Sequence, residues 1–205
     1  MTAAARGWHV VIPVKGAPLG KTRLAHPKRH ALARAFALDC LDAALAALGP
    51  DSLVIVTSDE LITPYVEGAG ARVVPDPGDG LNAAIRSGLA AVAPMGGPLA
   101  VLLGDLPALT AEDLTEALRE CALRPKTFIP DNAGSGTVLL AAVGVVPEPA
   151  FGGDSAARHE RAGYHRLALD LPRLRTDVDV RDDLAHVLSL GCGRHTASVI
   201  AASIG

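Results

Sequence analysis

Three aspartates of the sequence stand where their carboxylates could act together. Asp105 directly follows the apolar run at residues 99–104, so its carboxylate is expected at the carboxyl end of a central strand. A carboxylate there would be poorly solvated unless a cation such as Mg²⁺ bridged it to phosphate oxygens. Asp177 and Asp179 lie in a segment expected to be extended, so both side chains point the same way. Either of them could be a second metal ligand, while the alternative for Asp105 is a turn or helix-cap residue.

Basic residues and glycines form a second candidate site. The segment VKGAPLGKTR at 14–23 follows the first predicted strand and contains Lys15, Lys21 and Arg23. Its glycines let backbone N–H groups approach a phosphate chain, and its cations would neutralise that chain. A Walker A loop has four residues between its first glycine and the Gly-Lys pair, whereas this loop has three. We therefore favour a triphosphate loop of another kind, and a P-loop kinase or ATPase is the alternative.

A third segment, DPGDGLN at 76–82, could contribute to nucleotide recognition. It offers backbone groups and the Asn82 amide as partners for a base or a ribose. A plain turn followed by a helix, with Asp79 as the N-cap, explains the same residues. The segment by itself does not distinguish these two interpretations.

Two glycine-rich segments in the second half suit a phosphate or a carboxylate. They are GSGT at 134–137 and FGGDS at 151–155, and each combines glycines with a hydroxyl group. Ser155 falls at a predicted helix N-terminus, where backbone N–H groups favour an anion. Arg158 and His159 follow within one turn and are expected to be exposed helix residues.

Strands and helices alternate along the chain, which predicts how these segments are brought together. Strands are predicted at 8–14, 52–57, 71–74 and 98–103, with helices at 36–49, 60–68, 81–92 and 110–123. This alternation implies a three-layer α/β fold with a mostly parallel sheet, and ligands bind beyond the carboxyl ends of such strands. The second half is predicted to add strands at 127–129, 137–142 and 166–169, and helices from about 154, over 182–190 and over 194–203.

Length and composition indicate a single domain, residues 1–205, that acts in the cytoplasm. The chain is 49% hydrophobic but only 3% aromatic, which suits aliphatic helices packed on a sheet. A net charge of -3 argues against a duplex-binding protein, and the N-terminus lacks an apolar signal core. We therefore expect no nucleic-acid and no membrane partner. The three cysteines are far apart in the sequence, and we interpret them as buried hydrophobic residues.

Six segments, in order, resemble the motifs of the 2-phospho-L-lactate guanylyltransferase family, whose actinobacterial members use phosphoenolpyruvate. They are IPVKGAPLGKTRLA, DPGDGLNAAI, LLGDLPAL, DNAGSGTVLL, FGGDSAARH and TDVDVRDDL, and the similarity runs from about residue 8 to 195. The resemblance implies the Rossmann-like nucleotide-diphospho-sugar transferase fold, which molybdenum cofactor guanylyltransferases share. It also implies a role in the biosynthesis of the deazaflavin coenzyme F(420).

The resemblance further implies roles for single residues. It implies that Asp105 and Asp177 hold Mg²⁺, for which Mn²⁺ can substitute, and that the acceptor is bound by Thr137, Gly152 and Ser155. The residues that match its nucleotide-side motifs are Lys15, Lys21, Arg23 and Asn82. A nucleotide half is thus expected at about 8–125 and an acceptor half at about 126–190.

The reaction that the resemblance implies is an in-line displacement at the α-phosphorus of GTP by an acceptor phosphate oxygen. Lys21 and Arg23 would act as the catalytic cations on the departing pyrophosphate, and no general base is needed. The alternatives are a molybdenum cofactor guanylyltransferase-like enzyme, a P-loop NTPase and a non-catalytic GTP-binding module. The acceptor stays open between phosphoenolpyruvate, 2-phospho-L-lactate and a phosphoglycerate, although abundant Ala, Arg and Gly weakly favour phosphoenolpyruvate through a GC-rich source. The strictness for GTP over other nucleoside triphosphates stays open as well. The oligomeric state also stays open.

Overall fold

The computed structural model describes residues 7–16, 24 and 26–202, and the side chain of Arg181 lies outside this description. Within these residues a seven-stranded sheet forms the centre of the molecule. Its strands are β1 (His9–Pro13), β2 (Leu53–Val56), β3 (Arg72–Val74), β4 (Leu99–Leu102), β5 (Lys126–Pro130), β6 (Thr137–Ala142) and β7 (His165–Arg166). The helices are α1 (Arg29–Leu48), α2 (Ile62–Gly68), α3 (Leu81–Val92), α4 (Ala111–Cys121), α5 (Ser155–Arg161), α6 (Pro172–Arg175), α7 (Arg181–Leu190) and α8 (Arg194–Ala201), with short 3₁₀ turns η3 (Pro50–Ser52) and η4 (Ala93–Met95).

One strand of the sheet runs against all the others. The strand order is β3-β2-β1-β4-β6-β5-β7, and β6 pairs antiparallel with both β4 and β5 while the remaining pairs are parallel. The predicted mostly parallel sheet is therefore confirmed. The amino end of β6 consequently lies at the same edge as the carboxyl ends of the other six strands.

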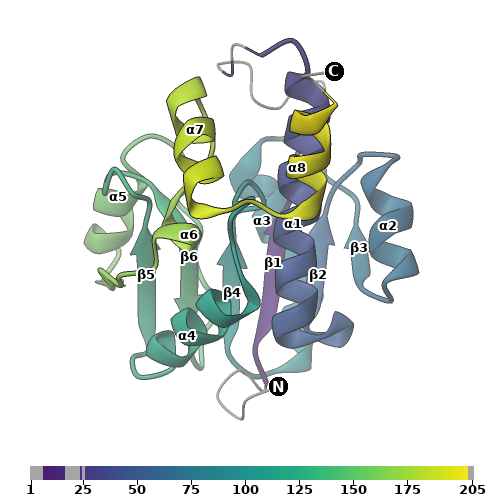
Figure 1. The fold of residues 1–205 in the computed structure, drawn as a ribbon. Coiled ribbons are helices and arrows are strands. Elements are labelled where there is room, and N and C mark those ends of the chain that lie inside the picture. The colour runs from purple at the N-terminus through teal and green to yellow at the C-terminus, as the bar shows by residue number, and fades with distance from the viewer. Residues whose placement is uncertain (1–6, 17–23, 25, 203–205) are drawn as a thin grey trace.

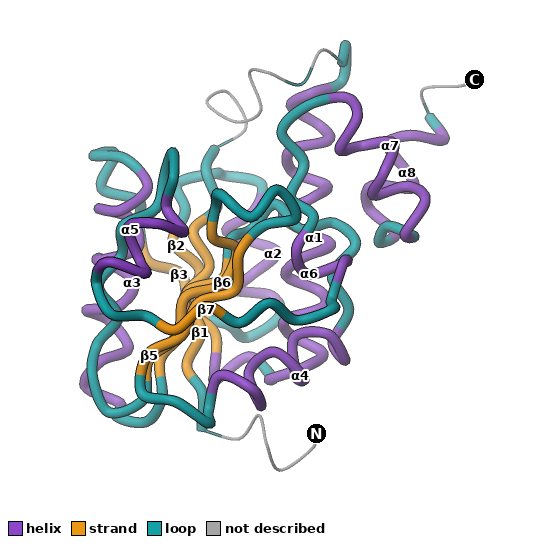
Figure 2. The backbone as a smooth tube through the Cα atoms, turned by 90° about the vertical axis from the view of Figure 1, so that its left-hand side faces the viewer, coloured by secondary structure: helices purple, strands orange, loops and turns teal. Residues whose placement is uncertain are grey.

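Helices cover both faces of the sheet, as the colouring by secondary structure makes visible (Figure 2). Because side chains alternate along a strand, Val10 and Ile12 of β1 belong to the core cluster that includes α1, α2 and α4, whereas Val11 belongs to the cluster that includes α3. Helix α8 lies alongside α1 (Figure 1), and residues of α7 and α8 share one buried cluster with Leu32 and Phe36 in the first turns of α1. The predicted three-layer arrangement is thus the observed one.

Local signals in the sequence account for most helix ends. Helix α1 ends at Gly49, which adopts a positive φ of 79° immediately before Pro50. At the start of α4, the Thr110 hydroxyl accepts a hydrogen bond from the Asp113 N–H, as its capping pattern predicted. The predicted N-cap at Asp79 was wrong, because Gly80 occupies that position and caps without a side chain.

Two short elements differ from the sequence prediction. Strand β7 is only two residues long, because it pairs with β5 at two positions before the chain leaves the sheet. Helix α6 was not predicted, since one turn carries too little periodicity to be recognised. Among the described residues, no helix is both long enough and apolar enough to cross a membrane.

Close packing of α3 on the sheet gives a testable consequence at Gly88. A Cβ atom there would overlap the side chains of Val11 and Val56, which belong to two adjacent strands of a rigid sheet. We expect Gly88→Ala to lower the free energy of unfolding by about 1–3 kcal/mol, measured by urea denaturation. Gly68→Ala is the matched control, because an added Cβ meets nothing near Gly68. Equal stability of the two variants would show that α3 can move away from the sheet.

Candidate functional site

Asp105 lies in the turn that follows β4, at the edge where the parallel strands end. The turn crosses the end of β1 closely, since a Cβ on Gly104 would lie 3.0 Å from the Pro13 carbonyl oxygen. Leu106 and Ala108 are buried directly after it, while Asp105 itself is half-buried. Glycine at 104 and apolar residues after 105 therefore hold the carboxylate in a defined position beside the ends of β1 and β4.

The acidic segment after α6 is anchored on both sides of its aspartates. Upstream, the Arg175 guanidinium donates hydrogen bonds to the carbonyl oxygens of Pro130, Asp131 and Leu169, at 3.2, 3.0 and 3.2 Å. Downstream, the Asp183 carboxylate accepts the N–H groups of residues 179 and 180, both at 2.8 Å. The segment is thereby fastened to the carboxyl end of β5 and to the first turn of α7.

Burial of Val178 decides which way the two aspartates point. Its side chain is fully buried against the cluster between α1 and α7, so Asp177 and Asp179 face the other way. This is the orientation that the two-residue spacing predicts. Asp177 is half-buried and Asp179 is exposed.

Asp105, Asp177 and Asp179 come together although more than seventy positions separate the first from the other two. Each offers a carboxylate oxygen, and these oxygens all lie within 4.8 Å of one another. Three carboxylates at this separation repel one another, so a divalent cation between them would lower the electrostatic energy. Their all-oxygen donor set matches Mg²⁺ or Mn²⁺. The predicted metal ligands Asp105 and Asp177 therefore lie in one cluster. Asp179 belongs to the same cluster, so the geometry does not decide which of Asp177 and Asp179 is the second ligand.

Thr137 begins β6 and lies close to the same edge. The carbonyl of the next residue, Val138, accepts the N–H of Leu103 at 2.9 Å, so Thr137 is level with the turn that carries Asp105. Its hydroxyl oxygen lies 2.9 Å from Nδ1 of His159. The Thr137 residue is only 3% exposed. An anion bound by this hydroxyl would be shielded from water, which strengthens the hydrogen bond.

His159 is not an exposed helix residue as the sequence suggested, because it is completely buried. Its ring packs against the rings of Phe128, Phe151 and Tyr164, with centroids 5.9, 5.2 and 5.7 Å away. Its Nε2 accepts the N–H of Ala150 at 3.1 Å. Burial, with a smaller contribution from the Arg158 charge, lowers the pKa of His159 from 6.5 to about 4.

Side chains hold the backbone of the loop before α5 at two successive residues. Ala150 donates its N–H to His159 and accepts the Arg158 Nε–H at 3.0 Å. Phe151 donates its N–H to the Asn82 amide oxygen at 2.8 Å and accepts the Asn82 amide N–H at 2.9 Å. Asn82, predicted on the nucleotide side, thus joins α3 to this loop with both of its polar atoms. Only its second N–H and spare lone pairs are left for a nucleotide.

The predicted acceptor residues Gly152 and Ser155 lie in the same loop and at its end. Gly152 is exposed and adopts a φ of 119°, which a residue with a side chain rarely adopts. Ser155 is 2% exposed and donates its N–H to the Gly152 carbonyl at 3.1 Å. The next N–H, of Ala156, donates to Ser135 at 3.0 Å. The first two amides of α5 therefore already have partners, and Ser155 would bind an anion through its hydroxyl.

Two charged residues flank Gly152 and Ser155. Asp154 is exposed in a left-handed conformation, with a φ of 53°, and its side chain does not cap α5. Arg158 lies in α5, and its Nη2 is buried with no hydrogen-bond partner among the described residues. A Cβ on Gly152 would lie 3.2 Å from this nitrogen. The arginine thus places a positive charge against the Gly152 backbone and opposes the Asp154 charge.

The cationic loop of the nucleotide side is only partly described. Lys15 follows β1 with an exposed side chain at the same edge as Asp105. Lys21 and Arg23, the two residues predicted to act on pyrophosphate, lie outside the described residues. Their roles therefore stay predictions from the sequence.

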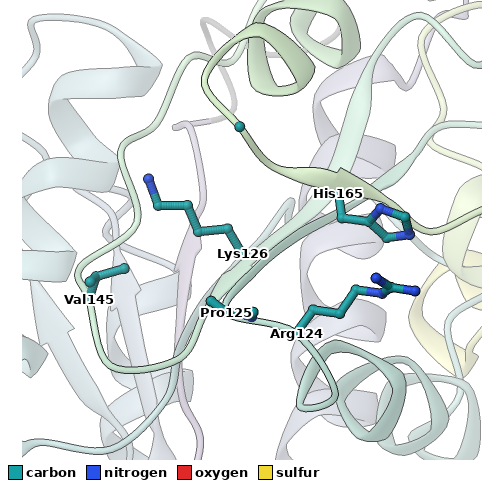
Figure 3. Close-up of a pocket in the computed structure, with 6 residues that line it drawn as sticks. Arg124, Pro125, Lys126, Val145 and His165 are labelled. Atoms are coloured by element: carbon teal, nitrogen blue, oxygen red, sulfur yellow. The ribbon is translucent and has the colours of Figure 1, made fainter.

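A cavity of about 320 Å³ lies away from the aspartates, as its lining residues indicate (Figure 3). It is lined by Arg124, Pro125, Lys126, Val145, Gly163 and His165. These residues surround the amino ends of β5 and β7 and the exit from β6. All three positions belong to the sheet edge opposite Asp105. The cavity is thus separate from the candidate site.

Sequence reasoning missed the residues that hold the site in place. Arg175 donates hydrogen bonds to three backbone carbonyl groups, and Asp131 accepts the N–H groups of Ser135 and Gly136. No local pattern signals the Arg175 contacts to Pro130 and Asp131, because the fold brings these segments together. The Asp131 contacts are local, and an aspartate followed by the Gly/Ser turn was the available signal for them. His159 was noticed but expected to be exposed, and its spacing of four residues from Ser155 indicates only that the two share one face of α5, not that this face is buried.

Comparison with known proteins defines the class to which this fold and site belong. The family model described as the MobA-like NTP transferase domain matches residues 31–178. Among solved structures, a protein described as a nucleotide-diphospho-sugar transferase from Desulfovibrio desulfuricans G20 superposes with a TM-score of 0.67. It is 16% identical and covers 97% of this chain and 96% of its own, so it supports the fold alone. Fold and family together define a nucleotidyltransferase.

Curated relatives give a narrower assignment over nearly the whole chain. Phosphoenolpyruvate guanylyltransferase of Geodermatophilus obscurus is 42% identical, covering 96% of this chain and 95% of its own. The protein of the same name from Streptomyces scabiei is 44% identical, covering 95% and 96%. The chain therefore belongs to the phosphoenolpyruvate guanylyltransferase family.

Burial of His159 predicts how stability depends on pH. The folded pKa of about 4 lies below the ordinary 6.5, so between these values the unfolded chain binds a proton that the folded chain does not. This contribution to stability is present above pH 6.5 and is lost as the pH falls to about 4, by up to roughly 3 kcal/mol. Urea denaturation across this range, compared between wild type and His159→Phe, measures it. If the free energy of unfolding of His159→Phe changed with pH as steeply as that of the wild type, this pH dependence would not come from His159.

Proposed function

We propose that this enzyme transfers the guanylyl group of GTP to the phosphate of phosphoenolpyruvate and releases pyrophosphate, as a step in coenzyme F(420) biosynthesis. The observation that carries the proposal is the convergence of three carboxylates at the strand edge where Thr137 also lies. The names of relatives that match over nearly their full length support the substrates. Both substrates are cytoplasmic metabolites, and we expect the enzyme to act there.

Asp105 and Asp177 are the proposed metal ligands, with Asp179 as a third oxygen donor. The fit rests on the donor chemistry and on carboxylate oxygens within 4.8 Å of one another. When bound, Mg²⁺ would neutralise the charge of the phosphates that meet in the reaction. A Mycobacterium tuberculosis protein of similar fold, with a TM-score of 0.56 and 23% identity, was solved in complex with manganese, and it covers 89% of this chain and 99% of its own. Manganese is therefore the natural probe for this site.

The two halves of the chain are proposed to divide the substrates between them. Residues 8–125 would bind GTP, with Lys15, Lys21 and Arg23 neutralising the triphosphate. Residues 126–190 would bind the acceptor. The Asn82 amide is hydrogen-bonded to the Phe151 backbone, so it connects the two halves and would fix their relative positions.

In the acceptor half, Thr137, Gly152 and Ser155 are proposed to contact phosphoenolpyruvate. Thr137 and Ser155 supply hydroxyl groups, and Gly152 permits close approach of the backbone. Arg158 lies beside Gly152 with a buried nitrogen that has no described hydrogen-bond partner, so its charge suits an anionic acceptor. This charge offsets the exposed carboxylate of Asp154.

The reaction requires positioning and charge neutralisation more than acid or base catalysis. An acceptor phosphate oxygen forms a bond to the α-phosphorus of GTP while the bond from that phosphorus to the bridging oxygen of pyrophosphate breaks. The attacking oxygen is ionised at neutral pH, so no side chain has to remove a proton. The protein would hold the two anions in line, and Lys21 and Arg23 would stabilise the charge gained by pyrophosphate.

Incubation with GTP and single candidate acceptors tests the proposed function directly. We expect pyrophosphate to form from GTP with phosphoenolpyruvate, and less or none with 2-phospho-L-lactate. Formation of GDP instead would identify a kinase or an NTPase. Binding of GTP without either product would identify a non-catalytic module.

Substitution of the aspartates tests the proposed metal site. Asp105→Asn and Asp177→Asn keep the side-chain size but remove a charge, so each should weaken Mn²⁺ binding and lower kcat about 100-fold or more. Electron paramagnetic resonance of bound Mn²⁺ provides a readout that is independent of turnover. Asp182→Asn is the matched control, because this exposed carboxylate in the first turn of α7 lies outside the cluster. Full activity in EDTA, or in both cluster variants, would make these carboxylates structural.

Thr137→Val tests the acceptor site. The change removes the hydroxyl but keeps a β-branched side chain of similar volume in the first position of β6. Loss of a hydrogen bond to a charged group should cost about 1.5–3 kcal/mol, seen as a higher KM for the acceptor with an unaltered KM for GTP. Steady-state kinetics with each substrate varied in turn measures both constants. An equal effect on both substrates would contradict a role confined to the acceptor.

A further inference from the structure

One imidazole joins the three segments that carry the proposed acceptor residues. His159 lies 2.9 Å from the Thr137 hydroxyl and 3.1 Å from the N–H of Ala150, two residues before Gly152. It also belongs to α5, the helix that begins at Ser155. The ring is completely buried among three aromatic side chains and cannot turn without disturbing them. Its position therefore determines how Thr137 faces the other two residues.

The hydrogen bonds of the ring define its tautomer. A backbone N–H can only donate, so Nε2 of His159 must be unprotonated where it accepts from Ala150. A neutral imidazole then carries its single proton on Nδ1. That proton lies towards the Thr137 oxygen, which must be the acceptor in this pair. The low pKa of the buried ring keeps His159 neutral at physiological pH.

The orientation of the Thr137 hydroxyl follows from this tautomer. A hydroxyl has one hydrogen, and a hydroxyl that accepts from Nδ1–H must direct its own hydrogen elsewhere. Thr137 lies at the strand edge beside the turn that carries Asp105, where an anionic substrate would meet it. In the opposite tautomer Thr137 would donate to Nδ1, and its oxygen lone pairs would face the anion and repel it.

We propose that His159 is a positioning residue that acts through Thr137, holding this hydroxyl as a hydrogen-bond donor to an anionic oxygen of the acceptor. The inference rests on the proposed role of Thr137 in acceptor binding. His159 itself touches no substrate. It makes the hydroxyl a donor before the substrate arrives, so no reorientation is needed on binding.

Two substitutions separate the two hydrogen bonds of the ring. His159→Asn places an amide N–H near the position of Nδ1, so it can still donate to Thr137 but no longer reaches Ala150. His159→Gln can place its amide oxygen near Nε2, so it can still accept from Ala150 while the donor to Thr137 is lost. We expect His159→Gln to raise the acceptor KM about tenfold or more with the KM for GTP unchanged, and His159→Asn to raise it less.

A double-mutant cycle with Thr137→Val distinguishes positioning from a general structural role. If His159 acts through Thr137, His159→Gln should have no further effect on the acceptor KM in a chain that already lacks the hydroxyl. Additive effects of the two substitutions on the acceptor KM, in active and folded variants, would overturn the proposal. A rise in the KM for GTP that equals the rise for the acceptor would overturn it as well.

Nitrogen-15 NMR of wild-type protein tests the tautomer without any substitution, so the proposal stays testable if a variant fails to fold. We expect the His159 shifts to identify a protonated Nδ1 and an unprotonated Nε2. A protonated Nε2 would overturn the inference whether or not the protein is active. Wild-type protein that forms no pyrophosphate with any acceptor would instead contradict the proposed function. If the wild type is active and the effects of His159→Gln and Thr137→Val on the acceptor KM are additive, this inference alone is contradicted.

Discussion

Electrostatic repulsion between like charges is the constraint on which this site depends. Three carboxylates lie with oxygen atoms within 4.8 Å of one another, at the edge where two anionic substrates are proposed to meet. Such a cluster needs rigid support, because free side chains would move apart. Arg175 and buried Val178 supply that support through backbone hydrogen bonds and packing. The contacts around the site therefore hold the three carboxylates close together.

Reversal of a single strand brings the proposed acceptor residue Thr137 to the same edge. In a fully parallel sheet the carboxyl edge presents only the loops that follow strands. Because β6 is antiparallel, its first residue also lies at this edge. Thr137 is consequently level with the turn after β4. The hydroxyl and the carboxylates thus share an edge although they come from different halves of the chain.

Hydrogen bonds from three side chains hold the backbone of the loop that carries Gly152, a proposed acceptor residue. Asn82, His159 and Arg158 bind the backbone of residues 150 and 151 with four hydrogen bonds. Each of the four backbone groups is paired in this way, which favours one arrangement of the loop, while Arg158 Nη2 has no described hydrogen-bond partner. The loop can therefore keep Gly152 in its positive-φ conformation before any ligand binds.

The sequence by itself determined the alternation of strands and helices, the helix stop at Gly49, and the segments that could bind phosphates and metal. These features depend on periodicity, glycine and short-range spacing, which are local properties of a chain. Only the tertiary structure decided that His159 is buried, that Asn82 holds Phe151, and that Asp105 meets both Asp177 and Asp179. Each of these depends on contacts between segments distant in sequence, and their geometry is set by strand order and packing rather than by any local pattern.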